Sequence, residues 1–180
     1  MNDLTLMTIC GALRAGSTNK LLLAEAARVF GVARVEEGDL RLPLYDNDLE
    51  DTAGLPDEVH LLADQIRRAD AVVISTPEYN KSLSGVLKNA LDWVSRVPGS
   101  VWRDKPVAIL SAADGRAGGE RAQFALRLCM VAFRPRLLTG PEVMVANSRT
   151  AFDATGRLTE PRTIKDLTEL MQALRVEAMR

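Results

Sequence analysis

Residues 4–30 read LTLMTIC-GALRAGSTN-KLLLAEAARVF, and this stretch decides the fold. Its apolar, β-branched run ends at Cys10 and predicts a strand buried on both faces. A glycine stops that run, and a hydroxyl side chain, Ser17 or Thr18, can then cap a helix that Gly31 ends. The stretch therefore predicts a buried strand, a glycine-containing loop and a helix in direct succession.

The same succession repeats along the chain, and Asp70–Thr76 is its clearest further strand, stopped by Pro77. Alternating strands and helices are typical of a parallel sheet with helices on both faces. We therefore predict a single α/β domain over residues 1–180. The predicted strands cover residues 4–10, 33–40, 70–76, 106–113 and 137–145, the helices begin near residues 17, 56, 82, 121 and 164, and residues 41–56 and 146–161 are predicted loops.

Composition and charge exclude several classes of function. Lys and Arg number 23 and Asp and Glu number 24, so a net charge of −1 gives no bulk attraction to nucleic acid or to an anionic membrane. Cys10 and Cys129 lie in apolar runs without metal-ligand spacing, and His60 is the one histidine, so we expect no metal site. We find neither a basic leader nor an apolar run long enough to span a membrane, and expect a cytoplasmic protein with no membrane insertion.

The first of three unusual loops is Gly11–Asn19. In open parallel sheets ligands bind beyond the carboxyl ends of the strands, which is where this loop lies. It leads into a helix N-terminus, where backbone N–H groups and the helix dipole favour an anion. Arg14, Ser17, Thr18 and Asn19 add side-chain donors suited to phosphate. A plain strand–helix turn with a serine cap is the alternative.

Other phosphate chemistries do not fit this loop. A Walker A motif needs lysine where Ser17 stands, and the G-x-G-x-x-G fingerprint of dinucleotide-binding loops is absent. Cys10 and Arg14 are too close in sequence for a low-molecular-weight tyrosine phosphatase. We therefore predict that Cys10 is a core residue and that the loop holds a single phosphate group.

Two further loops follow the third and fourth predicted strands. Thr76–Ser82 presents Tyr79, whose ring can line a planar ligand. Ser111–Gly119 is rich in small residues, which would let a flat ligand approach the backbone. Taken singly, either loop could be an ordinary turn.

Together these loops resemble the motifs of the NADPH-dependent FMN reductase family. Gly11–Asn19 reads GALRAGSTN and is similar to that family's G-S-L-R-x-G-S-x-N loop. Residues 76–93 read TPEYNKSLSGVLKNALDW and resemble its T-P-E-Y-N-x-S-x-P-G-x-L-K-N-A-x-D-W stretch. The likeness covers about residues 4–145 and extends to the quinone, chromate and azo-dye reductases of the family. It implies a flavodoxin-like three-layer sandwich whose five-stranded parallel sheet has the order 2-1-3-4-5.

The resemblance also implies how FMN is bound. Arg14, Ser17 and Asn19 would hold its phosphate, residues 77–80 its isoalloxazine ring and residues 111–115 the opposite ring edge. No catalytic side chain is expected, because flavin N5 carries the chemistry. The implied cofactor-binding residues are Ala12, Leu13, Arg14, Ser17, Thr18, Asn19, Pro77, Glu78, Tyr79, Asn80, Lys81, Ser111, Ala112, Asp114 and Gly115.

The implied activity is transfer of electrons from NADPH or NADH through FMN to a quinone, flavin, azo or chromate-type acceptor. A flavodoxin-like electron carrier and a flavin-binding regulatory protein without turnover are the alternatives. The chain departs from the family pattern at Ala12, Lys81 and Ala112, and Lys81 with Arg116 predicts a basic site mouth.

The resemblance further implies a homodimer or homotetramer in which a neighbouring subunit completes the flavin site. Arg121 and Glu142 match positions that can pair across such contacts.

Overall fold

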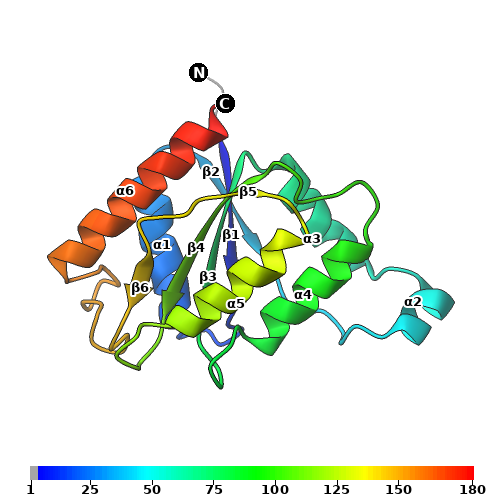
Figure 1. Ribbon diagram of the computed structural model, residues 1–180, viewed down its shortest axis with the longest axis horizontal. Helices are drawn as coiled ribbons and strands as arrows, with labels where there is room; N and C mark the ends of the chain where they lie inside the picture. The colour runs from blue at the N-terminus through cyan, green and yellow to red at the C-terminus, as the bar shows by residue number, and fades with distance from the viewer. Residues whose placement is uncertain (1–3) are drawn as a thin grey trace.

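Parallel strands form one sheet in the computed structural model, which describes residues 4–180 (Figure 1). Their order is β2-β1-β3-β4-β5, which confirms the predicted topology, and β6 also pairs with β4. Parallel pairing of Leu6 with Ala71 and of Val72 with Val107 brings the carboxyl ends of β1, β3 and β4 to one edge of the sheet. The strands are β1 (Thr5–Cys10), β2 (Arg34–Gly38), β3 (Ala71–Thr76), β4 (Pro106–Ala112), β5 (Arg136–Leu137) and β6 (Val143–Val145).

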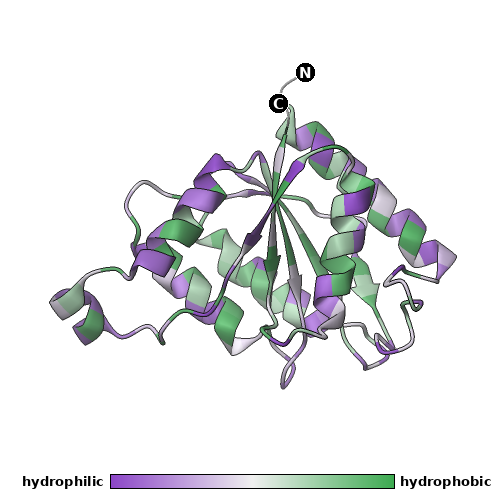
Figure 2. Ribbon diagram, turned by 180° about the vertical axis from the view of Figure 1, so that it is seen from behind, coloured by the Kyte–Doolittle hydropathy of each residue, from purple (hydrophilic) through white to green (hydrophobic). Residues whose placement is uncertain are grey.

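Helices cover both faces of the sheet. The helices are α1 (Thr18–Phe30), α2 (Asn47–Ala53), α3 (Asp57–Arg68), α4 (Gly85–Arg96), α5 (Glu120–Val131) and α6 (Pro161–Ala178). Strand residues alternate between two cores: Leu6 and Val73 pack with α1 and α6, whereas Met7 and Val72 pack with α3, α4 and α5. Figure 2 shows mostly apolar residues along the central strands of the sheet and mixed hydropathy along the helices. Within residues 4–180, no helix is both long and apolar enough to cross a membrane.

The strongest sequence signals give the elements that were predicted. Every residue of β3 and β4 is buried, as continuous apolar runs in a parallel sheet should be. The Ser17 hydroxyl caps α1 by accepting a hydrogen bond from the backbone N–H of Asn19 at 3.2 Å. Gly31 ends α1 with a φ of +93°, a conformation that side-chain-bearing residues rarely adopt.

The predicted loop at residues 41–56 was partly wrong, because it contains α2. Asp46 caps this helix by accepting from the Asp48 N–H at 2.9 Å. In Figure 1 α2 lies well away from the sheet, and none of its residues is buried. A helix that buries no residue has no apolar periodicity, so the sequence pattern gave no sign of it.

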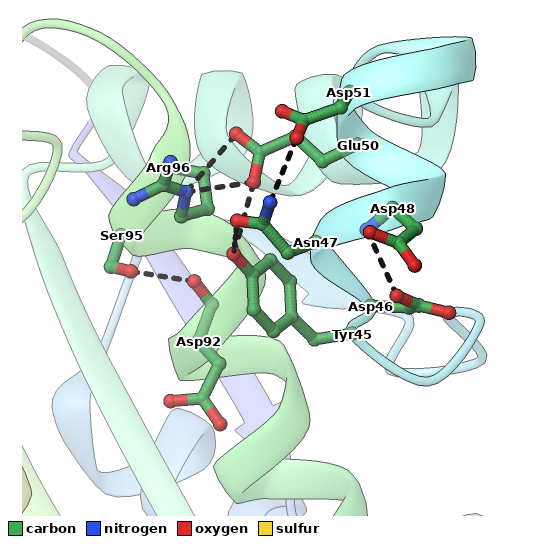
Figure 3. Close-up of polar contacts among 9 residues, drawn as sticks. All are labelled: Tyr45, Asp46, Asn47, Asp48, Glu50, Asp51, Asp92, Ser95 and Arg96. Carbon is green, nitrogen blue, oxygen red and sulfur yellow. Dashed lines mark hydrogen bonds and ion pairs between the residues drawn. The ribbon is translucent and has the colours of Figure 1, made fainter.

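A polar cluster links α2 to α4 (Figure 3). Arg96 Nε donates to both carboxylate oxygens of Glu50, at 3.0 and 2.9 Å, and the Tyr45 hydroxyl donates to Glu50 Oε2 at 3.0 Å. The bond from Arg96 lowers the pKa of Glu50, because it stabilises the carboxylate. This cluster, together with the partly buried Leu49 that packs against the apolar core, fixes α2 against the domain.

The predicted strand at 137–145 is two short strands. β5 pairs with the start of β4 and β6 with its end. Pro141 lies between them and has no N–H to donate to a ladder, so continuous pairing through this segment is not possible.

Candidate flavin-phosphate and ring loops

The phosphate loop, Gly11–Asn19, joins the carboxyl end of β1 to α1. Among residues 4–180, no protein acceptor hydrogen-bonds the backbone N–H groups of Leu13, Arg14, Ala15, Gly16 or Thr18. These donors lie at the positive end of the α1 dipole. Arg14 is exposed, and one of its guanidinium nitrogens donates to the Gly16 carbonyl at 2.6 Å, which keeps the side chain folded over the loop.

The side chain of Asn19 is hydrogen-bonded inside the protein. It is buried, with Nδ2 donating to the Ala112 carbonyl at 2.9 Å. Its Oδ1 accepts from the Ser75 hydroxyl at 2.8 Å and from the Ala112 N–H at 3.0 Å. These bonds tie α1 to the ends of β3 and β4. The amide therefore holds the loops in place, and below we propose that it does so instead of contacting phosphate.

The hydroxyls of the loop are also engaged within the protein. Thr18 Oγ1 donates to Ser148 Oγ at 3.2 Å. The Ser17 hydroxyl and the Ala12 N–H hydrogen-bond to Cys10 and lower its pKa, but burial outweighs them and the pKa of the Cys10 thiol is raised. A thiol held protonated is a poor nucleophile, which agrees with the prediction that Cys10 is structural.

Gly11 joins the first loop to the second. Its N–H donates to the Ser75 carbonyl at 2.8 Å, and its own carbonyl accepts from the Ser84 hydroxyl at 2.5 Å. A Cβ here would lie 3.1 Å from Pro77 Cδ and from Thr76 Oγ1, so a larger residue would push the two loops apart. Ser84 also caps α4 and was not among the predicted residues, although its place before a helical apolar pattern was a readable signal.

The second loop ends in a tight hairpin. Tyr79 and Ser82 exchange backbone hydrogen bonds of 3.0 and 3.1 Å around Asn80 and Lys81. Both central residues have positive φ, +50° and +67°, as in a type I′ turn. The turn holds Tyr79 outward with 53% of its surface exposed, so its ring is available to a ligand.

Glu78 fixes this second loop to α5. Its Oε2 accepts from the backbone N–H groups of Arg121 and Ala122, at 3.0 and 3.3 Å. Gly119, the residue before α5, offers no side-chain cap, so Glu78 supplies one from a distant loop. Its carboxylate lies where the helix dipole favours a negative charge. The sequence gave no sign of this role, which depends on the two loops being neighbours in space.

The third loop is built around buried Ser111, whose hydroxyl donates to the Gly118 carbonyl at 2.6 Å and accepts from Gln123 Nε2 at 2.9 Å. The sequence suggested that Gly118 and Gly119 make room for a ligand, but the structure shows that they do not. A Cβ on Gly118 would lie 2.6 Å from the backbone of Met144, and one on Gly119 would lie 2.8 Å from Ser111 Cβ. These glycines serve internal packing.

The remaining predicted residues of the third loop divide into two groups. Ala112 is buried, and Asn19 occupies both its N–H and its carbonyl. Asp114 and Gly115 are exposed; Asp114 pairs with Arg149 at 3.1 Å, and a Cβ on Gly115 would meet nothing within 4 Å. Only these exposed positions leave space for a ligand beside the backbone.

The three loops give the site mouth a positive charge. Arg14, Lys81, Arg116 and Arg121 are exposed, and within residues 4–180 none of them forms an ion pair with an acidic side chain. The carboxylate of Glu78, the acidic residue of the second loop, already accepts a hydrogen bond from the backbone of α5. The arrangement therefore favours an anionic ligand at the carboxyl ends of these strands.

Comparisons with known proteins agree with this geometry. Residues 4–150 match the family model described as NADPH-dependent FMN reductase. The chain is 42% identical over 178 residues to an NAD(P)H-dependent FMN reductase of Pseudomonas aeruginosa, covering 97% of this chain and 95% of that protein. It is 38% identical over 175 residues to a quinone reductase of Escherichia coli, covering 94% and 93%. Among solved structures, FerB, a flavoenzyme NAD(P)H:acceptor oxidoreductase of Paracoccus denitrificans, superposes with a TM-score of 0.86 at 31% identity, covering 97% of each chain.

Proposed function

The chain belongs to the NADPH-dependent FMN reductase family, and from that premise we propose that it is an FMN-containing NAD(P)H oxidoreductase that reduces a quinone-class acceptor. The relatives named above as FMN reductase and quinone reductase support the choice of donor and acceptor. The observation that carries the proposal is the run of backbone N–H groups at the α1 N-terminus, which no acceptor among residues 4–180 hydrogen-bonds and which lies beside the exposed Tyr79 hairpin.

We assign the FMN phosphate to the backbone N–H groups between Leu13 and Thr18 and to the Arg14 guanidinium. An anion at a helix N-terminus needs such converging donors, and this loop offers them without a competing protein acceptor. The fork of Arg14 matches two phosphate oxygens. Asn19 supports this binding by holding the loop against β3 and β4, and does not contact the phosphate itself.

We assign the isoalloxazine ring to the second and third loops. Tyr79 would line one side of the ring, and the backbone of Pro77, Glu78 and Asn80 would bond its polar edge. Asp114 and Gly115 are the exposed residues for the opposite edge. The bond from Glu78 to α5 limits movement of the second loop, so the ring would meet a preformed surface.

When bound, FMN supplies hydride acceptance and electron donation, so no side chain has to act as a catalytic acid or base. The chain's contribution is position and charge. Arg14, Lys81 and Arg116 would attract the anionic nicotinamide cofactor, either NADPH or NADH. Use of that cofactor and two free cysteines favour a reducing compartment, the cytoplasm.

We also propose that a second copy of the chain covers α5. Phe124, Leu128 and Val131 form a stripe on this helix, with 51%, 75% and 71% of their surface exposed. The stripe begins near Glu78 and hence near the site, so a partner there would border the flavin ring. Light scattering after gel filtration should give a dimer or tetramer, and Leu128→Glu should give monomers. Val176→Glu, on an exposed position of α6, is the matched control and should not change the assembly.

FMN binding and steady-state turnover test the assignment. The protein should bind FMN one to one with quenched flavin fluorescence, and should then oxidise NADPH when a quinone is present. Arg14→Ala should weaken FMN binding about tenfold or more, through loss of a charge-assisted pair. Arg103→Ala, at an exposed arginine outside all three loops, should bind FMN normally. Binding of FMN without NADPH oxidation would instead identify an electron carrier or a regulatory flavoprotein.

A further inference from the structure

A cavity of about 310 Å³ lies between α1 and the edge strand β2, and it borders the phosphate loop through Ala12 and Leu13. One face of α1 lines it with Lys20, Leu23, Ala24 and Ala27, which are spaced three and four residues apart. Val35 of β2 lies on the opposite wall, and 45% of its surface is exposed. The volume of the cavity falls within the lower part of the range for small-molecule sites, about 300–1,000 Å³.

Apolar residues and charged residues of both signs line the cavity. Lys20 and Arg41 supply the positive groups, and Glu37 and Asp39 supply the negative ones. Arg41 Nη1 bonds Asp39 at 3.0 Å, and its Nη2 donates to the Leu13 carbonyl at 3.3 Å, so it borders the phosphate loop. Within the described chain, Lys20 and Glu37 form no ion pair and remain available to a ligand.

From this geometry we infer that the α1–β2 cavity binds an adenosine 5′-phosphate group. The two alanines of α1 leave a slot of small side chains suited to a flat base. The carboxylates of Glu37 and Asp39, at the end of β2, can accept hydrogen bonds from a ribose diol, as acidic residues at that position do in dinucleotide-binding folds. Lys20 and Arg41 receive the phosphate. A neutral quinone or a lipid tail has no charge to pair with Lys20 and no diol to donate to Glu37, so either fits this lining less well.

The adenylate group can come from two sources. One is the distal half of NADPH or NADH, whose nicotinamide must reach the flavin; the other is free AMP acting as a regulator. Which of them is used rests on the proposed function, whereas binding of the group does not.

Titration of AMP into FMN-loaded protein tests the assignment, because FMN blocks the phosphate loop. We expect one AMP per chain. Ala24→Leu fills the slot and should weaken AMP binding about tenfold or more. Ala173→Leu, at an exposed alanine of α6, is the matched control and should bind AMP as the wild type does. Absence of AMP binding, or equal binding by Ala24→Leu and wild type, overturns the inference.

Kinetics on the same samples separate the two sources. If Ala24→Leu raises the KM for NADPH but not for reduced nicotinamide mononucleotide, which lacks the adenylate, the group belongs to the co-substrate. If AMP binds and both KM values match the wild type, the ligand is the free nucleotide. If NADPH reduces the FMN-loaded protein but AMP does not bind to it, this inference alone is overturned. Protein that binds AMP but is not reduced by NADPH overturns the proposed function alone.

Discussion

Replacing Asn19 with alanine should destabilise the fold more than any exposed substitution in the phosphate loop. The change removes three hydrogen bonds, one from the Ser75 hydroxyl and two that involve the N–H and the carbonyl of Ala112. Each buried polar group left unpaired costs about 1–3 kcal/mol. Taking the lower end for all three gives a loss of about 3 kcal/mol, out of a typical total of about 5–15 kcal/mol.

Urea unfolding of the FMN-free protein, followed by circular dichroism, measures this loss without a contribution from cofactor binding. With an m value of about 2 kcal/mol per molar, the midpoint should fall by about 1.5 M. Asn47→Ala is the control: the Asn47 side chain is exposed, bonds only the side chains of Tyr45 and Asp51, and its loss should shift stability by about 0.5 kcal/mol or less.

The same variant separates a positioning role from direct phosphate binding. If Asn19 positions the loops, stability falls strongly and FMN affinity falls with it. A variant as stable as the wild type that has lost FMN affinity about a hundredfold would show that the amide contacts phosphate, and our proposal would be wrong.

Three further predictions concern the second loop, the third loop and α2. Glu78→Ala removes the remote cap of α5 and should lower the free energy of unfolding by about 1 kcal/mol, measured by urea titration, with Glu78→Gln losing less; an unchanged midpoint would contradict the capping role. Gly119 has a φ of +94°, and a Cβ there would clash with Ser111, so Gly119→Ala should lower the free energy of unfolding by about 2 kcal/mol or more, measured by thermal unfolding. Gly115→Ala, where a Cβ meets nothing within 4 Å, should be close to neutral. Equal losses of stability in the two variants would refute the packing role of Gly119. Arg96 lowers the pKa of Glu50 in the folded state. The stability that this ion pair contributes is therefore present above the pKa of an unfolded carboxyl group, and it is lost as the pH falls through the folded-state pKa of Glu50. Urea midpoints measured from neutral to acidic pH should therefore fall less steeply for Glu50→Gln, and parallel curves would contradict this.

The sheet could be predicted because its signals are local. The buried run at residues 71–76 identifies β3 by itself, and Ser17 and Gly31 mark the two ends of α1. Strand order followed from the family resemblance, and was confirmed. α2 was missed because its one large apolar residue, Leu49, is too little for a periodic pattern. β5 and β6 were merged because the apolar run continues on both sides of Pro141.

The positions of the three loops could be predicted from the sequence, whereas their internal contacts could not. The three loops do lie at the carboxyl ends of β1, β3 and β4. The parts played by Asn19 and Glu78 depend on partners that are distant in sequence, Ala112 and the start of α5, and no local pattern encodes such partners. The same holds for Gly118 and Gly119, which sequence composition alone suggested were open to a ligand.

The central claim is that FMN held by these loops accepts hydride from a nicotinamide cofactor, and anaerobic stopped-flow mixing tests it most directly. FMN-loaded protein is mixed with NADPH in the absence of oxygen and of any acceptor, and the visible absorption band of the flavin is followed. We predict rapid bleaching of that band, and its return when a quinone is added. A band that persists with NADPH and with NADH, in protein shown to hold FMN, would contradict the account.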